Sequence, residues 1–294
     1  MSIHQRAVLA TLSLNSIGNA RKDKAVTNEV CVRKRADATA GRWSNTIWPA
    51  DAITPVQHID GKIRKYIAAK TLPWIDDGRR LLPSNLLQEV SDRIRQFKYE
   101  RAAAIDDFFA GYFTHVATMR QLRGDLFRET DYPPPSKLRD RFGFAFTFEP
   151  VPHHDDFRLN LAAEQRQEME DSVRAALGEA EAIARRELIT RILEPLRHMA
   201  GVLARAEPGK IYDSLLGNVL AIANAIPDFN ITDDPRLAEI HDKIKLRFAF
   251  VTTEEIRDNN LVRARAVRHA TEIADGLSAF MGDEEPSQLQ AIPA

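Results

Sequence analysis

The chain has 294 residues, 44% of them hydrophobic and 28% charged, and a formal net charge of −1. This composition predicts a soluble globular protein with enough apolar residues for one large or two small cores, and it excludes a disordered chain outside the C-terminal tail. The N-terminus lacks an apolar core of signal-peptide length, and no window approaches the ~18 apolar residues of a membrane-spanning helix. We therefore expect a cytoplasmic protein.

Charge is distributed unevenly along the chain. Residues 1–150 contain 24 Lys and Arg against 17 Asp and Glu, a balance of +7, whereas residues 151–294 contain 17 against 25, a balance of −8. This asymmetry is compatible with a basic surface for nucleic acid, or with two halves that attract each other within or between protomers. An ordinary solvated surface with uneven charge is the alternative.

Two short segments near the N-terminus alternate in the manner of β-strands. They are residues 7–14 (AVLATLSL) and 27–35 (TNEVCVRKR), and the polar segment between them allows a hairpin with a long loop. The second contains the only cysteine, Cys31, which excludes an intrachain disulfide and a thiolate-rich zinc site. We predict a buried thiol on a strand rather than a nucleophile. A helix should begin near Ala50.

The segment 71–83 (TLPWIDDGRRLLP) is the least generic short stretch of the chain. Its proline and glycine interrupt regular structure, and its Asp-Asp-Gly sequence is a turn signal. We predict that Trp74 is buried and that Asp76 or Asp77 accepts hydrogen bonds from backbone amides of the turn. Catalytic carboxylates at the two aspartates are the alternative.

Apolar residues spaced by three and four occupy residues 83–132 and predict one continuous helix. The YPPP sequence at 132–135 ends it. At 1.5 Å per residue, some 45 residues make a rod of about 68 Å, which is longer than one small core can cover. The rod therefore needs a partner.

A second long helix is predicted over residues 161–205, after a strand at 142–151 whose phenylalanines lie on one side. Residues 156–161 alternate and can complete a β-hairpin with that strand. Because the connection is short and the two long helices have similar lengths, we expect them to run antiparallel as a coiled-coil-like pair. Three shorter helices follow, the last opened by a capping box, at residues 211–226, 235–248 and 253–281.

These elements predict an α+β protein that is mostly α. The long helices carry more apolar surface than one protomer can bury, so we also expect a homo-oligomer, as a dimer or a ring. Four consecutive parts are expected: a basic N-terminal β/α region (1–82), the long helical pair with a β-hairpin at about 142–161 (83–207), a C-terminal helical cluster (208–282) and a disordered tail (283–294).

The sequence lacks familiar catalytic and cofactor motifs. It contains no GxxxxGK[ST], GxGxxG, HExxH or GxSxG sequence, so we expect neither an enzyme nor a cofactor. Metal-capable side chains cluster at His153, His154, Asp155 and Asp156. Neighbouring residues of an extended chain point to opposite faces, so few of them can reach one ion. A polar turn is the preferred interpretation, and a metal site is the alternative.

Basic and aromatic residues interleave in the N-terminal third. This composition is typical of a groove for single-stranded nucleic acid, because bases stack on aromatic rings while cations follow the phosphates. Core tryptophans beneath surface cations are the alternative interpretation. The predicted nucleic-acid-binding residues are Arg42, Trp43, Trp48, Lys62, Arg64, Lys65, Arg79 and Arg80.

Several local sequences, in the same order, resemble a family of uncharacterised proteins encoded by tailed bacteriophages and prophages. They are TLPWIDDGRRLLP, DYPPPSKLRDRFGF, PVPHHDDFRLNL and GNVLAIANAIPDFNITDDP, and the resemblance covers roughly residues 5–280. Because that family has no established activity, the resemblance assigns a role to no residue. It implies a bacterial host cytoplasm and work on phage DNA or phage assembly.

Two hypotheses of function follow. The first is a non-enzymatic phage protein that binds or anneals nucleic acid, with single-stranded DNA as the leading candidate, in replication or recombination. The second is a helical scaffold or adaptor that docks onto a phage structural protein or an ATPase. The near-zero net charge favours the second, because it is poor for a general polyanion binder. Neither hypothesis includes a membrane partner.

Overall fold

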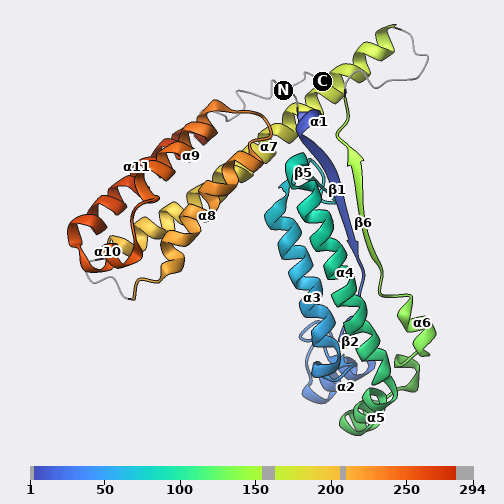
Figure 1. Ribbon diagram of the computed structural model, residues 1–294. Helices are drawn as coiled ribbons and strands as arrows, with labels where there is room; N and C mark the ends of the chain where they lie inside the picture. Colours follow the sequence, from blue (N-terminus) through green and yellow to red (C-terminus); the bar gives the residue numbers. More distant parts are fainter. Residues whose placement is uncertain (1–2, 154–162, 206–209, 283–294) are drawn as a thin grey trace. The chain divides into compact units, whose positions relative to one another are not determined.

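Helices predominate in the structure, and a four-stranded and a two-stranded sheet accompany them (Figure 1). This arrangement confirms the predicted α+β, mostly α, class. The computed structural model describes residues 3–153, 163–205 and 210–282. In the part of the chain so described, no helix is both long enough and apolar enough to cross a lipid bilayer.

The chain divides into two compact units, each assembled from separate segments of sequence. Unit 1 takes the residues up to Ala10, the segment Thr71–Leu87 and the chain from Phe148 onward. Unit 2 takes Thr11–Lys70 and Gln88–Thr147. This division differs from the consecutive parts predicted from the sequence, because the chain leaves unit 1 and returns to it twice.

The main sheet has four strands in the order β4, β5, β1, β6. β1 (Ala7–Leu14) coincides with the first predicted strand and follows a single helical turn, α1 (Ile3–Arg6). β4 (Leu72–Pro73) and β5 (Arg79–Pro83) form an antiparallel hairpin in which Leu72 lies opposite Leu81. Both leucines are buried, so the hairpin presents an apolar face to the core of unit 1.

β6 (Phe144–Pro150) confirms the strand predicted at 142–151. Its neighbour in the sheet is β1, whereas the predicted partner at 156–161 lies outside the described residues. The expected aromatic face is only partly covered, because Phe148 is 41% exposed. β1 ends 130 residues before β6 begins. Local alternation of apolar residues predicts that a segment is a strand, but it does not identify a partner strand so distant in sequence.

The second predicted strand is a helix, α2 (Lys24–Lys34), so the predicted hairpin between residues 7–14 and 27–35 is wrong. Asp23 caps this helix: its Oδ1 accepts hydrogen bonds from the backbone N–H groups of Ala25 (3.1 Å) and Val26 (3.2 Å). Arg35 adopts a left-handed conformation (φ 54°) that closes the last turn. The caps outweigh the strand preference of the β-branched residues between them. Cys31 is buried, as predicted, but on a helix.

Unit 2 is organised around α3 (Ala50–Lys70) and α4 (Leu87–Ala110). The predicted start of α3 near Ala50 is confirmed, and its buried face carries isoleucines and Val56. A buried ion pair joins the two helices: Nε of Arg101 donates to Oδ1 of Asp60 at 2.7 Å, and each side chain is 3% exposed. Nη2 of Arg101 also donates to the carbonyl oxygen of Asn15 at 2.6 Å. These bonds compensate the desolvation of the two charges.

The first long helix is interrupted, so the predicted single rod over residues 83–132 is wrong. α4 ends at Ala110, and α5 (Tyr112–Arg123) begins after Gly111. A Cβ atom at Gly111 would lie 2.5 Å from Nε2 of His115, so the imidazole occupies the space that a side chain would need. Shorter elements complete the helical segments: η1 (Ser84–Leu86), η2 (Gly124–Leu126), η3 (Glu129–Asp131) and α6 (Pro135–Arg139).

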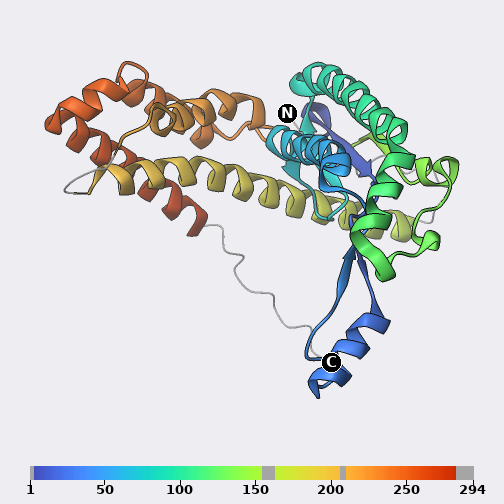
Figure 2. The same ribbon diagram turned by 90° about the horizontal axis from the view of Figure 1, so that it is seen from below.

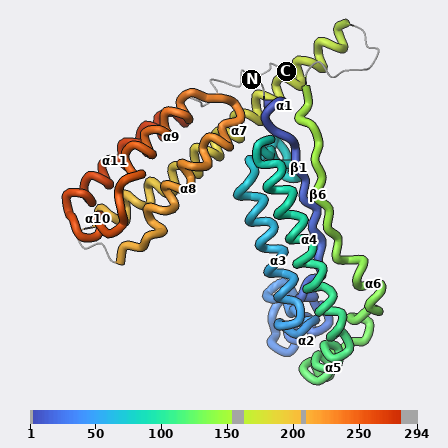
Figure 3. The backbone as a smooth tube through the Cα atoms, viewed as in Figure 1, coloured from blue at the N-terminus to red at the C-terminus, as the bar shows by residue number. Residues whose placement is uncertain are grey.

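Four helices of unit 1 form a bundle (Figures 1 and 3). Each packs against two of the others, in the order α7, α8, α9, α11 and back to α7. α9 coincides with the predicted helix at 235–248, and Thr252 and Glu255 form the predicted capping box before α10. The helices are α7 (Ala163–Leu203), α8 (Asp213–Phe229), α9 (Pro235–Phe248), α10 (Thr253–Asp258) and α11 (Asn260–Gly282).

The predicted pairing of the two long helices is wrong. α7 belongs to unit 1, where α8 and α11 pack along it, whereas α4 and α5 belong to unit 2. Buried side chains such as Leu188, Ile192 and Met199 occupy the apolar stripe of α7. An apolar stripe requires a cover, but its spacing does not identify which helix supplies that cover.

Candidate nucleic-acid interface

One segment of unit 2 contains a high density of positively charged side chains. It consists of β2 (Ala20–Lys22), α2 and β3 (Ser44–Thr46), and we call residues 20–46 the basic arm (blue in Figure 2). β2 and β3 pair antiparallel, with Arg21 opposite Asn45. The arm contains three acidic residues and seven cations, and all seven cations are exposed: Arg21, Lys22, Lys24, Arg33, Lys34, Arg35 and Arg42.

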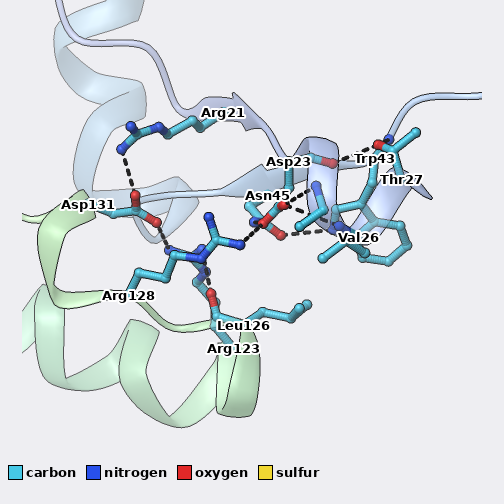
Figure 4. A network of polar contacts seen from close by, with 11 residues as sticks. Arg21, Asp23, Val26, Thr27, Trp43, Asn45, Arg123, Leu126, Arg128 and Asp131 are labelled. Atoms are coloured by element: carbon cyan, nitrogen blue, oxygen red, sulfur yellow. Dashed lines mark hydrogen bonds and ion pairs between the residues drawn. The ribbon is translucent and has the colours of Figure 1, made fainter. Parts of the chain in front are cut away.

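Asp23 fixes the arm to the rest of unit 2 (Figure 4). This carboxylate is buried, and besides capping α2 its Oδ2 accepts hydrogen bonds from Asn45 (2.9 Å) and Arg128 (2.8 Å). The N–H of Val26, the charge of Arg128 and the amide of Asn45 hold the pKa of Asp23 below its ordinary value, although burial opposes this shift. Asp23 is therefore ionised at neutral pH and joins α2, β3 and the segment before η3.

The carboxylate of Asp131 also connects the basic arm to the rest of unit 2. Oδ1 of Asp131 accepts a hydrogen bond from Arg21 of β2 at 2.6 Å, and Oδ2 accepts one from Arg123 of α5 at 3.0 Å (Figure 4). Arg123 also donates to the carbonyl oxygen of Leu126 at 2.7 Å, which orders the turn after α5. Two buried carboxylates thus bind three arginines at the base of the arm: Asp131 pairs with Arg21 and Arg123, and Asp23 pairs with Arg128. The remaining cations of the arm are exposed to solvent.

Trp43 is the aromatic residue that the arm presents to solvent. Its side chain is 43% exposed, and its indole Nε1 donates to Oδ1 of Asn45 at 2.8 Å. Its backbone N–H donates to Oγ1 of Thr27 at 2.9 Å. The indole therefore has a fixed orientation and an already satisfied N–H group. Such a ring can stack on a base without first losing conformational freedom.

A hollow of about 400 Å³ adjoins Trp43. Residues of β3 line it together with apolar residues of α5 and η2, and Arg123 provides the charge. Leu122 on its rim is 72% exposed. The lining is therefore suited to a flat, partly apolar ring such as a nucleobase. The lining residues are Trp43, Ser44, Asn45, Thr46, Trp48, Pro49, Ala50, Met119, Leu122, Arg123 and Leu126.

Five predicted binding residues lie on exposed parts of unit 2. Arg42 and Trp43 belong to the basic arm, whereas Lys62, Arg64 and Lys65 lie on the solvent face of α3. Arg64 donates to the carbonyl oxygen of Leu14 at 3.4 Å, a long contact that leaves most of its donors for other partners. These five residues remain candidates for phosphate and base contacts.

Trp48 is a core residue, which corrects its assignment as a stacking platform. It is 2% exposed, and its ring centroid lies 5.1 Å from that of Phe108, 5.6 Å from Tyr112 and 5.2 Å from Tyr132. Aromatic neighbours therefore cover the indole. Trp48 is among the residues that line the hollow beside Trp43, but at 2% exposure its ring is not available for stacking on a base.

Arg79 and Arg80 belong to unit 1 and have local partners. Arg79 pairs with Asp76 at 2.6 Å, and Nε of Arg80 donates to Oγ1 of Thr71 at 2.6 Å. Burial lowers the pKa of Arg80, and the neighbouring Arg191 lowers it further. These contacts secure the β4–β5 hairpin and do not support the two arginines as phosphate ligands.

The predictions for the turn of this hairpin are confirmed. Trp74 is 5% exposed, and Oδ1 of Asp76 accepts hydrogen bonds from the backbone N–H groups of Gly78 (3.1 Å) and Arg79 (2.9 Å). These bonds hold the pKa of Asp76 below its ordinary value, the largest contribution coming from the side chain of Arg79. Asp76 therefore has a structural role, as the turn interpretation required.

Sequence reasoning missed the residues that position the arm. Asp23, Asn45 and Arg128 were not singled out, because two of them act across long sequence separations. One signal was present: an aspartate immediately before Lys24-Ala25-Val26 is a typical N-cap.

No group of three or more potential metal ligands occurs in the described part of the chain. His153 lies edge-on to His4, with ring centroids 4.2 Å apart. Its predicted companions His154, Asp155 and Asp156 lie outside the described residues. The proposed polar turn at this position therefore stays a prediction.

Comparison with protein-family models, curated proteins and solved structures gave no match to this chain. The resemblance to phage-encoded proteins consequently stays a prediction, and function has to be argued from the geometry described above.

Proposed function

We propose that this chain is a non-enzymatic nucleic-acid-binding protein of a phage or prophage, which binds single-stranded DNA in replication or recombination. The observation that carries the proposal is the basic arm, which combines seven exposed cations with Trp43, whose backbone N–H and indole N–H are both hydrogen-bonded within the arm. In the proposed complex, phosphates contact the cations of the arm and a base stacks on Trp43. Lys62 and Lys65 of α3 are the second group of candidate phosphate contacts.

Single-stranded DNA is favoured over a duplex by the exposed indole and its adjoining hollow. An unpaired base can leave its neighbours and stack on an aromatic ring, whereas a base inside a duplex is already stacked on both faces. The near-zero net charge of the chain does not oppose this function, because the charge that matters is local to the arm.

Fluorescence anisotropy with a labelled oligonucleotide tests the proposal. We expect binding at low salt that weakens with rising salt, with a logarithmic slope of about −0.7 per neutralised phosphate. The triple variant Lys22→Gln/Arg33→Gln/Lys34→Gln should reduce the magnitude of that slope by about 2, because it removes three cations of the arm.

A matched control removes the same charge elsewhere in unit 2. Lys98, Lys137 and Arg141 are exposed and lie outside the arm. The corresponding triple glutamine variant should keep the wild-type slope and most of the affinity. Absence of wild-type binding at low salt, or equal losses in the two triple variants, would contradict the proposal.

A scaffold or adaptor function remains the second candidate, and exposed apolar side chains favour it. Phe113 of α5 is 77% exposed, and it belongs neither to the basic arm nor to the residues that line the hollow beside Trp43. Pull-down from infected cells after nuclease treatment separates the two candidates. A protein partner that survives nuclease supports the adaptor, whereas loss of every partner supports nucleic-acid binding.

A further inference from the structure

The strand β3 has one open edge. In the described part of the chain, β2 and β3 form a sheet of two strands, so β3 has a neighbouring strand on one side only. Along an edge strand, the backbone N–H and C=O groups of successive residues point alternately toward the neighbouring strand and away from it. The phase of this alternation decides which residues of β3 offer free backbone groups.

Two hydrogen bonds that flank the strand pair fix this phase. The N–H of Asp23 donates to the carbonyl oxygen of Trp43 at 3.0 Å. The N–H of Ile47 donates to the carbonyl oxygen of Asn19, also at 3.0 Å. Hydrogen-bonded pairs recur at every second residue of an antiparallel ladder. Asn45 is two residues from both Trp43 and Ile47, so its backbone groups point toward β2.

Ser44 and Thr46 therefore direct their backbone groups away from β2. Among the described residues, no hydrogen bond engages these N–H and C=O groups. Ser44, Asn45 and Thr46 all line the hollow beside Trp43. Side chains of successive strand residues alternate between the two faces of a sheet, so a hollow over one face would be lined by every second residue. Because three consecutive residues line this hollow and β2 covers the opposite edge, the hollow adjoins the open edge of β3.

We propose that this open edge binds the Watson–Crick edge of one unpaired base, whose ring occupies the hollow beside Trp43. The inference rests on the proposed function and adds the contact by which the base is held. Ser44 and Thr46 each offer an N–H donor and a C=O acceptor, and the Watson–Crick edge of every base carries groups that can bond to them. In a duplex those groups are already bonded to the opposite strand. The contact consequently selects unpaired bases without selecting a sequence.

A nucleobase suits this edge better than an added peptide strand does. A peptide that extends a sheet gains its affinity from a row of main-chain hydrogen bonds. β3 has only three residues, two of which direct their backbone groups outward, so the row would be short. A base needs few hydrogen bonds and an apolar cover for its ring. Met119, Leu122 and Leu126 line the same hollow and can provide that cover.

Fluorescence anisotropy with two labelled oligonucleotides of equal length tests the proposal on the full chain. One is oligothymidylate, and the other is built from 3-methylthymidine. The methyl group blocks N3 on the Watson–Crick edge, whereas the phosphates and the two faces of the ring remain. The wild type should bind the methylated oligonucleotide more weakly, by about 2- to 12-fold for each hydrogen bond lost.

A proline substitution tests the contribution of the strand edge. Thr46→Pro removes the outward N–H of residue 46 and should preserve the β2–β3 ladder, because proline is tolerated on an edge strand where its nitrogen faces away from the neighbour. The variant should bind oligothymidylate more weakly and discriminate less between the two oligonucleotides. Thr46→Val is the matched control, since it also loses the hydroxyl group but keeps the N–H, and it should discriminate as the wild type does. Circular dichroism checks that both variants are folded.

The possible outcomes separate this inference from the proposed function. Equal affinity of the wild type for the two oligonucleotides overturns the inference alone and leaves a peptide strand as the candidate partner of the edge. Absence of binding to both oligonucleotides overturns the inference together with the proposed function. Equal discrimination by folded Thr46→Pro and Thr46→Val also overturns the inference. The comparison of oligonucleotides on the wild type is decisive even where Thr46→Pro fails to fold.

Discussion

The indole N–H of Trp43 donates a hydrogen bond of 2.8 Å to Oδ1 of Asn45, only two residues further along the chain. Asn45 in turn donates to the buried carboxylate of Asp23, which also binds Arg128. The exposed ring is therefore connected, through one amide and one carboxylate, to the part of unit 2 that follows α5. This connection gives the candidate interface a defined shape before any ligand binds.

Two substitutions of Trp43 distinguish the contribution of its ring as a stacking surface from the contribution of the hydrogen bond that orients the ring. Trp43→Ala should weaken oligonucleotide binding by about 1–3 kcal/mol, the value of one base–aromatic stacking contact. The melting temperature should change little, because the ring is 43% exposed. Trp43→Phe keeps a stacking face but loses the bond to Asn45, so its affinity should fall between wild type and Trp43→Ala. Anisotropy titrations and thermal melts measure both quantities, and a large loss of stability without loss of binding would identify Trp43 as structural.

Acidification should release the basic arm. The pKa of Asp23 is lower in the folded protein than in the unfolded chain, so the carboxylate contributes stability that is fully present above about pH 4, where the unfolded side chain is ionised. That contribution is lost as pH falls through the folded-state pKa. The protection factors of the α2 amides, which correct for the intrinsic pH dependence of hydrogen exchange, should therefore fall below about pH 4 in the wild type.

Asp23→Asn provides the control for this pH dependence. The amide can still cap α2 but cannot pair with Arg128, so α2 should exchange faster than in the wild type at neutral pH. The additional loss of protection at low pH should largely disappear in this variant. Equal pH dependence in wild type and variant would assign the effect to another group.

Trp74 should behave in the opposite way to Trp43. Because Trp74 is 5% exposed, Trp74→Ala should lower the free energy of unfolding by about 3–5 kcal/mol through the cavity it creates. Its Nε1 has no hydrogen-bond partner among the described residues, so Trp74→Phe removes an unsatisfied donor and should cost less. Chemical denaturation measures these differences. Oligonucleotide binding by the folded protein should be unaffected, and a loss of binding at unchanged stability would place Trp74 in the interface.

The buried pair Asp60–Arg101 should show strong coupling. Asp60→Leu or Arg101→Met alone leaves one charge buried without its partner and should cost about 3–5 kcal/mol. The double variant removes both charges and should recover much of that loss, although the bond from Arg101 to Asn15 is not replaced. A double-mutant cycle of unfolding free energies tests this, and additive losses would show that the two side chains act independently.

Short-range signals allowed several elements to be predicted from the sequence. Alternation located β1, a proline located the start of α9, and the Thr-Thr-Glu-Glu sequence located the start of α10. The turn at Asp76 follows from local chemistry in the same way, because its acceptors and donors lie within three residues. Each of these features depends on neighbours in the chain.

The failures involve partners that are distant in sequence or competition between two local signals. In α2, an Asp N-cap competes with alternating β-branched residues, and the cap prevails. At Gly111, the break depends on where the ring of His115 packs. Trp48 and Trp43 have similar surroundings in sequence, but only the three-dimensional core shows that one is buried and the other is exposed. Of the eight predicted binding residues, Trp48 is therefore a core residue and Arg79 and Arg80 have local partners, whereas the other five stay candidates.

The division of each unit into separated segments has a consequence for synthesis of the chain. All segments of unit 2 have been translated once Thr147 is added, whereas unit 1 still lacks its four bundle helices at that moment. At about 5–20 residues per second, the second half of the chain takes on the order of ten seconds to translate. During that interval the β4–β5 hairpin, with Trp74 and Leu81, has no bundle to pack against on the nascent chain. Slowing translation after Thr147 should therefore increase chaperone association and aggregation through unit 1 segments, while unit 2 can already have folded on the ribosome.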